Sequence, residues 1–74
     1  MRTPKQYETV ALLEDIPEKN LWRGQVGVIV EIYGDAEAFE LEFIDDNGHT
    51  YALDTIYADK LIPLSHKSRE LIAA

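Results

Sequence analysis

The segment Phe39-Glu40-Leu41-Glu42-Phe43 decides the fold class, because apolar and acidic residues alternate over its five positions. Successive side chains of a β-strand point to opposite faces, so the three apolar side chains share one face and the two carboxylates share the other. This arrangement is typical of an antiparallel strand that covers a core on one side and meets solvent on the other. We therefore expect a half-buried antiparallel strand over residues 39–43.

The residues that follow predict a tight hairpin. Residues 45–48 read Asp-Asp-Asn-Gly, and an Asn-Gly pair is typical of a type I′ turn, in which both central residues have positive φ. Residues 50–55 then supply the partner strand. A calcium loop is the alternative for the turn. With Gly48 at the sixth position of such a loop, however, Phe43 and Asp54 would occupy the first and twelfth, where a carboxylate and a glutamate are required. We therefore expect a hairpin turn and no metal site.

The N-terminal half predicts two further strands. Residues 8–13 form a short apolar run, and the polar, proline-containing residues 14–20 then predict a long loop. Residues 28–33 are the most β-branched segment of the chain, so they predict a second strand. Gly24 and Gly27 stand just before it, where glycine permits a tight turn, a bulge or a close approach of two backbones.

The C-terminal part predicts a last, shorter strand. Residues 57–60 have the pattern of a single helical turn, and residues 61–64 follow as a strand whose Pro63 suits an edge or an end. In the remaining residues, 65–74, Ser68 is a candidate N-cap for a short helix.

The order of these elements predicts the fold. Five short strands, a long first loop and a 3-10 turn before the last strand indicate an all-β, five-stranded SH3-like small barrel over residues 1–64. Residues 65–74 then form a C-terminal tail with a helical pattern. A chain of 74 residues supports one such domain with a thin core. An oligonucleotide-binding barrel fits less well, because the Asn-Gly turn leaves no room for the helix that such barrels carry between their third and fourth strands.

Composition restricts the partners and the chemistry. Fourteen acidic residues against seven basic ones give a net charge of −7, which phosphate backbones and anionic lipids repel. No apolar run approaches the about 18 residues that a membrane span needs, and no signal-peptide pattern is visible. The absence of cysteine removes thiolate chemistry, and two histidines argue against a transition-metal site. We expect a cytoplasmic protein without a cofactor, with no membrane association and with nucleic acid disfavoured.

Three glutamates are the first candidate binding residues. Glu40 and Glu42 share the solvent face of their strand, and Glu31 belongs to the predicted neighbouring strand. Solvation alone explains such residues in most proteins. A glycosidase-type carboxylate pair would need a substrate cleft, for which this domain has little room. A third interpretation is electrostatic steering of a basic partner, which would account for keeping like charges together.

Trp22, Tyr33 and Tyr57 are the other candidate binding residues. Trp22 lies in the long loop, where two roles stay open: a lid over one end of the barrel, which is the commoner role, or an exposed anchor. The same two roles apply to the tyrosines. Aromatic residues that share a surface with the acidic strand would form the pattern of an interface hot spot.

No arrangement of residues indicates catalysis. His49 and His66 flank different predicted elements, and the adjacency of Ser65 and His66 does not make a catalytic triad. Gly24 and Gly27 lack the third glycine and the following helix of a phosphate-binding loop. We therefore expect that the protein is not an enzyme.

An ordered pattern of residues carries a family resemblance: Val10-Ala11-Leu12, Glu14-Asp15-Ile16-Pro17, Leu21, Gly24, Gly27, Val30-Glu31, Glu40-Leu41-Glu42-Phe43, Gly48 and Thr50-Tyr51-Ala52-Leu53. The pattern resembles a family of small, mostly bacterial proteins that is known only as a domain of unknown function. The resemblance covers residues 7–64 and implies an SH3-like barrel. Families of this type are suspected of acting as partners of another small protein, as in toxin and antitoxin pairs. The resemblance therefore implies a fold and a kind of partner but no functional residue.

Taken together, these patterns predict a non-enzymatic binding module. In this hypothesis the acidic strand face and the aromatic residues dock a basic protein partner, in an antitoxin-like role. The first alternative is a structural small-barrel protein that self-assembles into a homo-oligomer through exposed strand edges. The second is a nucleic-acid-binding small barrel, which the net charge disfavours.

Overall fold

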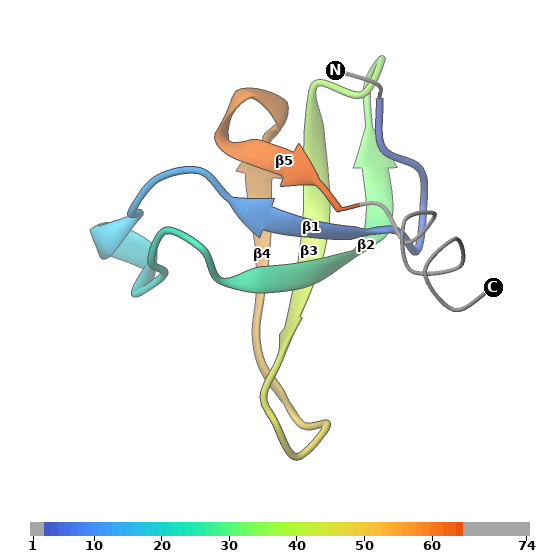
Figure 1. Ribbon diagram of the computed structural model, residues 1–74. Coiled ribbons are helices and arrows are strands. Elements are labelled where there is room, and N and C mark those ends of the chain that lie inside the picture. Colours follow the sequence, from blue (N-terminus) through green and yellow to red (C-terminus); the bar gives the residue numbers. More distant parts are fainter. Residues whose placement is uncertain (1–2, 65–74) are drawn as a thin grey trace, which may run out of the picture.

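Residues 3–64 are described by a computed structural model, and they fold into one antiparallel sheet of five strands (Figure 1). The elements are β1 (Thr9–Leu12), the 3-10 helix η1 (Pro17–Lys19), β2 (Val26–Tyr33), β3 (Ala38–Ile44), β4 (Thr50–Tyr57), the 3-10 helix η2 (Ala58–Lys60) and β5 (Leu61–Pro63). The strand order is β4-β3-β2-β1-β5. The prediction of an all-β fold with a 3-10 turn before the last strand is therefore confirmed.

The closed barrel stays a prediction. β4 and β5 are the two edges of the sheet, and within the described residues they do not pair with each other. The sheet is nevertheless strongly curved, because β1 and β5 pass in front of β3 and β4 in Figure 1. The tail over residues 65–74, with its expected short helix, lies outside the described residues. Within them, no helix is long and apolar enough to cross a membrane.

The core lies on the concave side of the sheet, and β3 runs through its centre. Phe39, Leu41 and Phe43 are each 0% exposed, as their alternation with glutamates predicts. Side chains from every strand and from the long first loop complete the cluster: Val10, Leu12, Ile16, Leu21, Ile29, Ile56 and Leu61. Burial of one such large apolar side chain contributes about 1.5–3 kcal/mol, so this small cluster supplies the main stabilisation of the fold.

Gly27 lies at a close approach between β2 and β3. A Cβ atom added at this position would lie 3.2 Å from the carbonyl oxygen of Glu42 and 3.2 Å from the ring of Phe43. The register pairs Gly27 directly with Phe43. Any larger residue would therefore press on both groups, and this close approach of two backbones is one of the roles that the glycine predicts.

A β-bulge at Val30 changes which side chains of β2 face outward. Val28 pairs with Glu42 and Ile29 with Leu41, but the next pair joins Glu31 to Glu40, so Val30 is left out of the ladder. The carbonyl oxygen of Val30 instead accepts a hydrogen bond from Nε2 of Gln6, at 3.0 Å. Because of the extra residue, Glu31 lies on the same face as Val28 rather than on the opposite one.

The predicted type I′ turn between β3 and β4 is wrong. Of the two central residues only Gly48 has positive φ, at 80°, and Asn47 does not. The amide of Gly48 donates to the carbonyl of Asp45 at 3.0 Å, and the amide of Asp45 donates to the carbonyl of His49 at 2.9 Å. This is a three-residue loop with its glycine in the left-handed region. The Asp45 carboxylate explains the difference, because its Oδ1 accepts hydrogen bonds from the amides of Asn47 and His49, each at 2.9 Å.

Candidate binding face

The register of β2, β3 and β4 places five of the six predicted binding residues on the convex side of the sheet. Across these strands one row is Tyr33, Ala38 and Tyr57, the next is Glu31, Glu40 and Thr55, and the third is Val28, Glu42 and Leu53. Alternate residues of a strand share a face, so the three rows stand side by side on the side away from Phe39, Leu41 and Phe43. We call these nine residues the outer face.

The glutamates of the outer face form a like-charged group. Glu31 and Glu40 are direct cross-strand partners, an arrangement that is destabilising for like charges. Oγ1 of Thr55 donates to Oε1 of Glu40 at 2.6 Å, and Oγ1 of Thr50 donates to Oε2 of Glu42 at 2.8 Å. These two hydroxyl groups draw the carboxylates of β3 over β4. Negative charge therefore gathers near one edge of the sheet.

Two tyrosines flank this charge. Tyr33 and Tyr57 both pair with the small, buried Ala38, so their rings stand on either side of it, one row away from Glu40. Partial burial, the charges of Glu40 and Glu31 and a hydrogen bond to Glu40 raise the pKa of the Tyr33 hydroxyl above its ordinary value. Tyr33 therefore interacts electrostatically with Glu40 and Glu31.

Trp22 is the predicted residue that does not join the outer face. It lies in the long loop between β1 and β2, is 46% exposed, and donates its backbone amide to Oε1 of Gln25. Nε2 of Gln25 in turn donates to the hydroxyl of Tyr51 at 2.9 Å. The neighbouring Leu21, in contrast, is buried in the core. Trp22 thus stands at the surface as an exposed aromatic residue.

Sequence reasoning missed the residues of β4 that complete the outer face. Leu53 and Thr55 lie on the outer face together with Tyr57. The sequence ends this strand at Thr55, whereas β4 continues to Tyr57, so positions 53, 55 and 57 all belong to one strand. The 3-10 turn correspondingly covers residues 58–60. A strand predicted to end at residue 57 would have placed positions 53, 55 and 57 on one face, because every second residue of a strand faces the same side.

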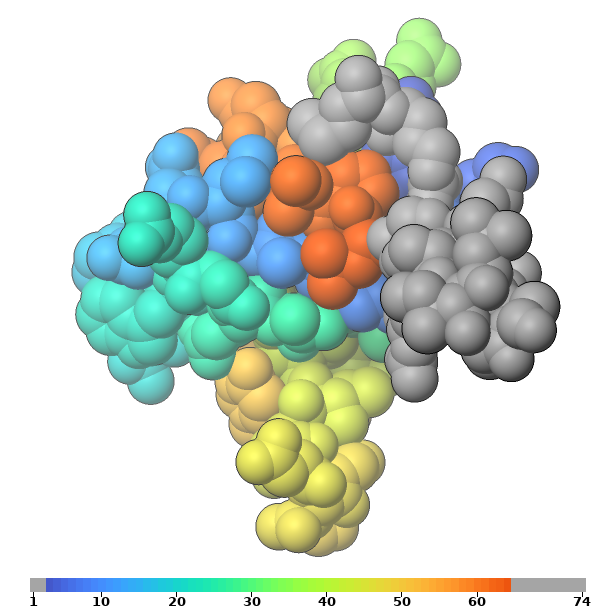
Figure 2. All heavy atoms as spheres, in the orientation of Figure 1, coloured from blue at the N-terminus to red at the C-terminus, as the bar shows by residue number. Residues whose placement is uncertain are grey.

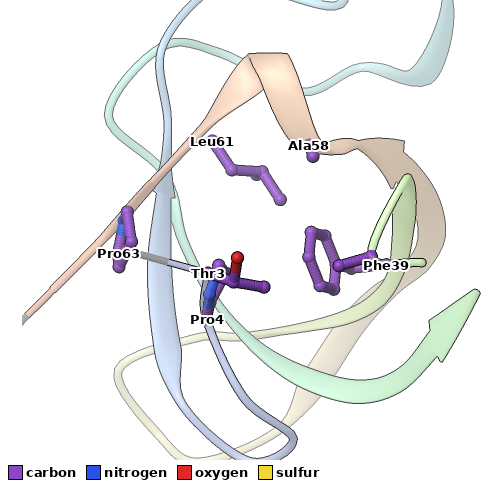
Figure 3. A pocket seen from close by; sticks show the side chains of 7 residues that line it. Thr3, Pro4, Phe39, Ala58, Leu61 and Pro63 are labelled. Atoms are coloured by element: carbon purple, nitrogen blue, oxygen red, sulfur yellow. The ribbon is translucent and has the colours of Figure 1, made fainter. Parts of the chain in front are cut away.

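Two of the hollows on the described surface are lined in part by residues of the sheet. The smaller, of about 170 Å³, is lined by Thr3, Pro4, Ala36, Phe39, Ala58, Leu61 and Pro63. In Figure 3 the side chains of Phe39 and Leu61 point into it. The larger, of about 350 Å³, lies between η1 and the end of β4 and is lined by Ile16, Glu18, Lys19, Thr55, Ile56, Tyr57 and Lys60. It shares Thr55 and Tyr57 with the outer face, so the two features are continuous.

The two lysines of the larger hollow are held by ion pairs. Nζ of Lys19 lies 3.4 Å from Oδ1 of Asp54, and Nζ of Lys60 lies 2.7 Å from Oε1 of Glu14. The hydrogen bond to Glu14 and its charge raise the pKa of Lys60, so this side chain keeps its positive charge. Over residues 3–64, no group of three or more histidine, aspartate or glutamate side chains is placed to hold a metal ion.

Comparison with known proteins identifies the family. Residues 6–63 match the model of a family described as Domain of unknown function (DUF4926). The chain belongs to this family. The match runs from just before β1 to the end of β5, so the DUF4926 domain and the five-stranded sheet coincide. The expected resemblance to an uncharacterised domain family is confirmed. No curated protein and no solved structure matches the chain.

Proposed function

We propose that this DUF4926 domain is a non-enzymatic, cytoplasmic binding module with an SH3-like small-barrel fold, and that it docks a basic protein through its outer face. The observation that carries the proposal is the register. It brings Glu31, Glu40 and Glu42 together with Tyr33 and Tyr57 on one side of three adjacent strands. Charged groups near rigid aromatic rings are typical of binding hot spots.

The like-charged pair on β2 and β3 supports a binding role. Glu31 opposite Glu40 costs stability because like charges repel. Among the nine residues of the outer face none is basic, so no cation within the rows offsets this repulsion. A basic partner would remove this repulsion on binding. It would also be attracted from a distance, since a surface of one sign raises association rates.

Exposed apolar side chains on the same face distinguish a binding surface from a merely solubilising one. Tyr57 is 65% exposed, Leu53 is 56% exposed and Tyr33 is 43% exposed. A surface that serves solubility alone consists of charged and polar residues and avoids such side chains. Apolar residues that surround charges on one face favour a protein partner. The family resemblance adds an antitoxin-like role, in which the partner is a small basic protein.

Charge reversal tests the proposal. The variant E40K/E42K and the matched control D46K/D59K each change the net charge from −7 to −3, because each of two reversals adds two units. Asp46 lies in the hairpin turn and Asp59 in η2, and neither is one of the nine residues of the outer face. Wild type and both variants are immobilised, exposed to a lysate of the native host, and the captured proteins are identified by mass spectrometry.

We expect wild type and D46K/D59K to retain the same basic protein and E40K/E42K to lose it, while circular dichroism shows that all three are folded. The proposal is wrong if E40K/E42K captures that protein as well as the control does, or if the captured protein is acidic.

A further inference from the structure

β4 is a long edge of the sheet. Among the described residues its only strand partner is β3, and it is eight residues long. It contains neither proline nor lysine, which natural proteins place on edges to prevent further pairing. The opposite edge, β5, is three residues long and ends at Pro63. Figure 2 shows the turn end of the β3–β4 hairpin extending away from the rest of the molecule. β4 is therefore the edge that has room for another strand.

The two sides of this edge differ in charge. On the convex side, the carboxylates of Glu40 and Glu42 are drawn over β4 by Thr55 and Thr50. Between η1 and the end of β4 lies the larger hollow, whose lining includes Glu18, Lys19 and Lys60 and the buried Ile16 and Ile56. A chain lying along β4 would thus meet the glutamates of the outer face on one side. At the hollow it would meet apolar side chains together with charges of both signs.

We propose that the basic partner binds as an extended segment that adds a sixth strand to the free edge of β4. This inference rests on the proposed function and specifies the form of the partner. Successive side chains of an added strand alternate between the two sides. Its lysine or arginine residues stand at every second position and face Glu40 and Glu42, and the residues between them are apolar and face the hollow. The buried Ile16 and Ile56 of the hollow favour apolar side chains at these positions.

The charge pattern selects a basic partner over a second copy of this chain. Two copies joined edge to edge through β4 would bring two acidic faces together, and each copy carries a net charge of −7. Repulsion between like-charged surfaces opposes that assembly. A basic strand at the same edge would be attracted by the acidic face instead of repelled.

Synthetic peptides test the inference directly. The probe is a peptide as long as β4 in which lysine and valine alternate, with blocked ends. A second peptide has the same composition with all lysines in one block. Two further peptides carry the alternating sequence with N-methyl groups on either the odd or the even backbone amides. Binding is measured by calorimetry, and the contact surface by amide chemical shifts of the full chain.

We expect the alternating peptide to bind at least about tenfold more tightly than the block peptide, a difference of about 1.4 kcal/mol. It should shift the amides of β4, and one of the two N-methylated peptides should fail to bind, because only every second amide faces β4. E40K/E42K should weaken binding by a similar factor, and D46K/D59K should not.

Three results would overturn strand addition. The first is equal binding of the alternating and block peptides, and the second is full binding of both N-methylated peptides. The third is a dimer in sedimentation analysis whose β4 amides are protected from exchange, because a second copy would then occupy the edge. If the N-methylated peptides bind fully and E40K/E42K still loses its natural partner, docking at the outer face stands and only its strand-addition form is wrong.

Discussion

The two faces of β3 show how one strand separates stability from recognition. On its concave side Phe39, Leu41 and Phe43 are fully buried, and they hold β1, β5 and the long loop against the sheet. On its convex side Glu40 and Glu42 are hydrogen-bonded to threonines of β4 and stand among exposed tyrosine and leucine side chains. The concave side therefore stabilises the fold by packing, whereas the convex side carries the repulsion between Glu31 and Glu40, which lowers stability. Mutations on the two sides should therefore change different measurements.

The largest effect on stability is expected from Leu41→Ala on the concave side. Removing a fully buried leucine leaves a cavity and costs about 2–5 kcal/mol, which is much of the stability of a small domain. The matched change on the convex side, Glu42→Gln, should stay within about 0.5 kcal/mol. Urea unfolding followed by circular dichroism measures both. Equal destabilisation by the two substitutions would contradict the division of β3 into two faces.

A smaller effect is expected from Gly27→Ala, which tests the contact between β2 and the concave side of β3. The added methyl group would press on the Phe43 ring and the Glu42 carbonyl, and such overpacking costs about 1–3 kcal/mol. In a Phe43→Leu background the smaller side chain leaves room, so the same substitution should cost less. A double-mutant cycle measures this coupling. Additive effects of the two substitutions would mean that the contact is not the cause.

On the convex side, Glu31→Gln should raise stability. It removes one of two directly opposed carboxylates, and the expected gain is about 0.2–1 kcal/mol. The gain should shrink as salt is added, because the removed interaction is electrostatic. Urea unfolding at low and high ionic strength checks both points. A loss of stability in low salt would show that Glu31 stabilises the fold, and it would remove the argument for a binding role that rests on the like-charged pair.

The smallest effect is a change in titration. Because Glu40 and Glu31 contribute to the raised pKa of Tyr33, Glu40→Gln should lower that pKa toward its ordinary value. Tyrosinate absorbance of each protein, compared with the same protein carrying Tyr33→Phe, isolates this hydroxyl. The folded state keeps the Tyr33 proton longer than the unfolded state. Its contribution to stability is therefore complete below the unfolded pKa and is lost as the pH rises through the folded pKa. An unchanged pKa of Tyr33 in the variant would contradict the electrostatic interaction between Tyr33 and Glu40.

The alternation over residues 39–43 was enough to predict the core strand and its acidic side, because side chains that alternate between apolar and acidic must lie on opposite faces of a strand. The position of Glu31 was not predictable in the same way. Simple alternation from the buried Ile29 would turn Glu31 toward the core, and only the bulge at Val30 turns it outward.

The hairpin illustrates a second limit of sequence reasoning. Asn-Gly is compatible with more than one loop, and the choice was made by the Asp45 carboxylate, which accepts two amides of the turn. Trp22 is a third case. Leu21 and Trp22 are adjacent apolar residues in one loop, and which of them enters the core depends on the bridge between Ile16 and Leu21, a tertiary feature that the local sequence does not specify.

The affinity of the purified partner for uncharged variants tests the central claim most directly. E40Q/E42Q and D46N/D59N both carry a net charge of −5, because each of two neutralisations adds one unit to −7. Calorimetry of each protein with the partner identified by capture compares the outer face with the rest of the surface at equal charge. We predict that E40Q/E42Q binds at least about tenfold more weakly than D46N/D59N, and that the difference shrinks in high salt. Equal affinities of the two variants would contradict the claim that the outer face is the docking surface.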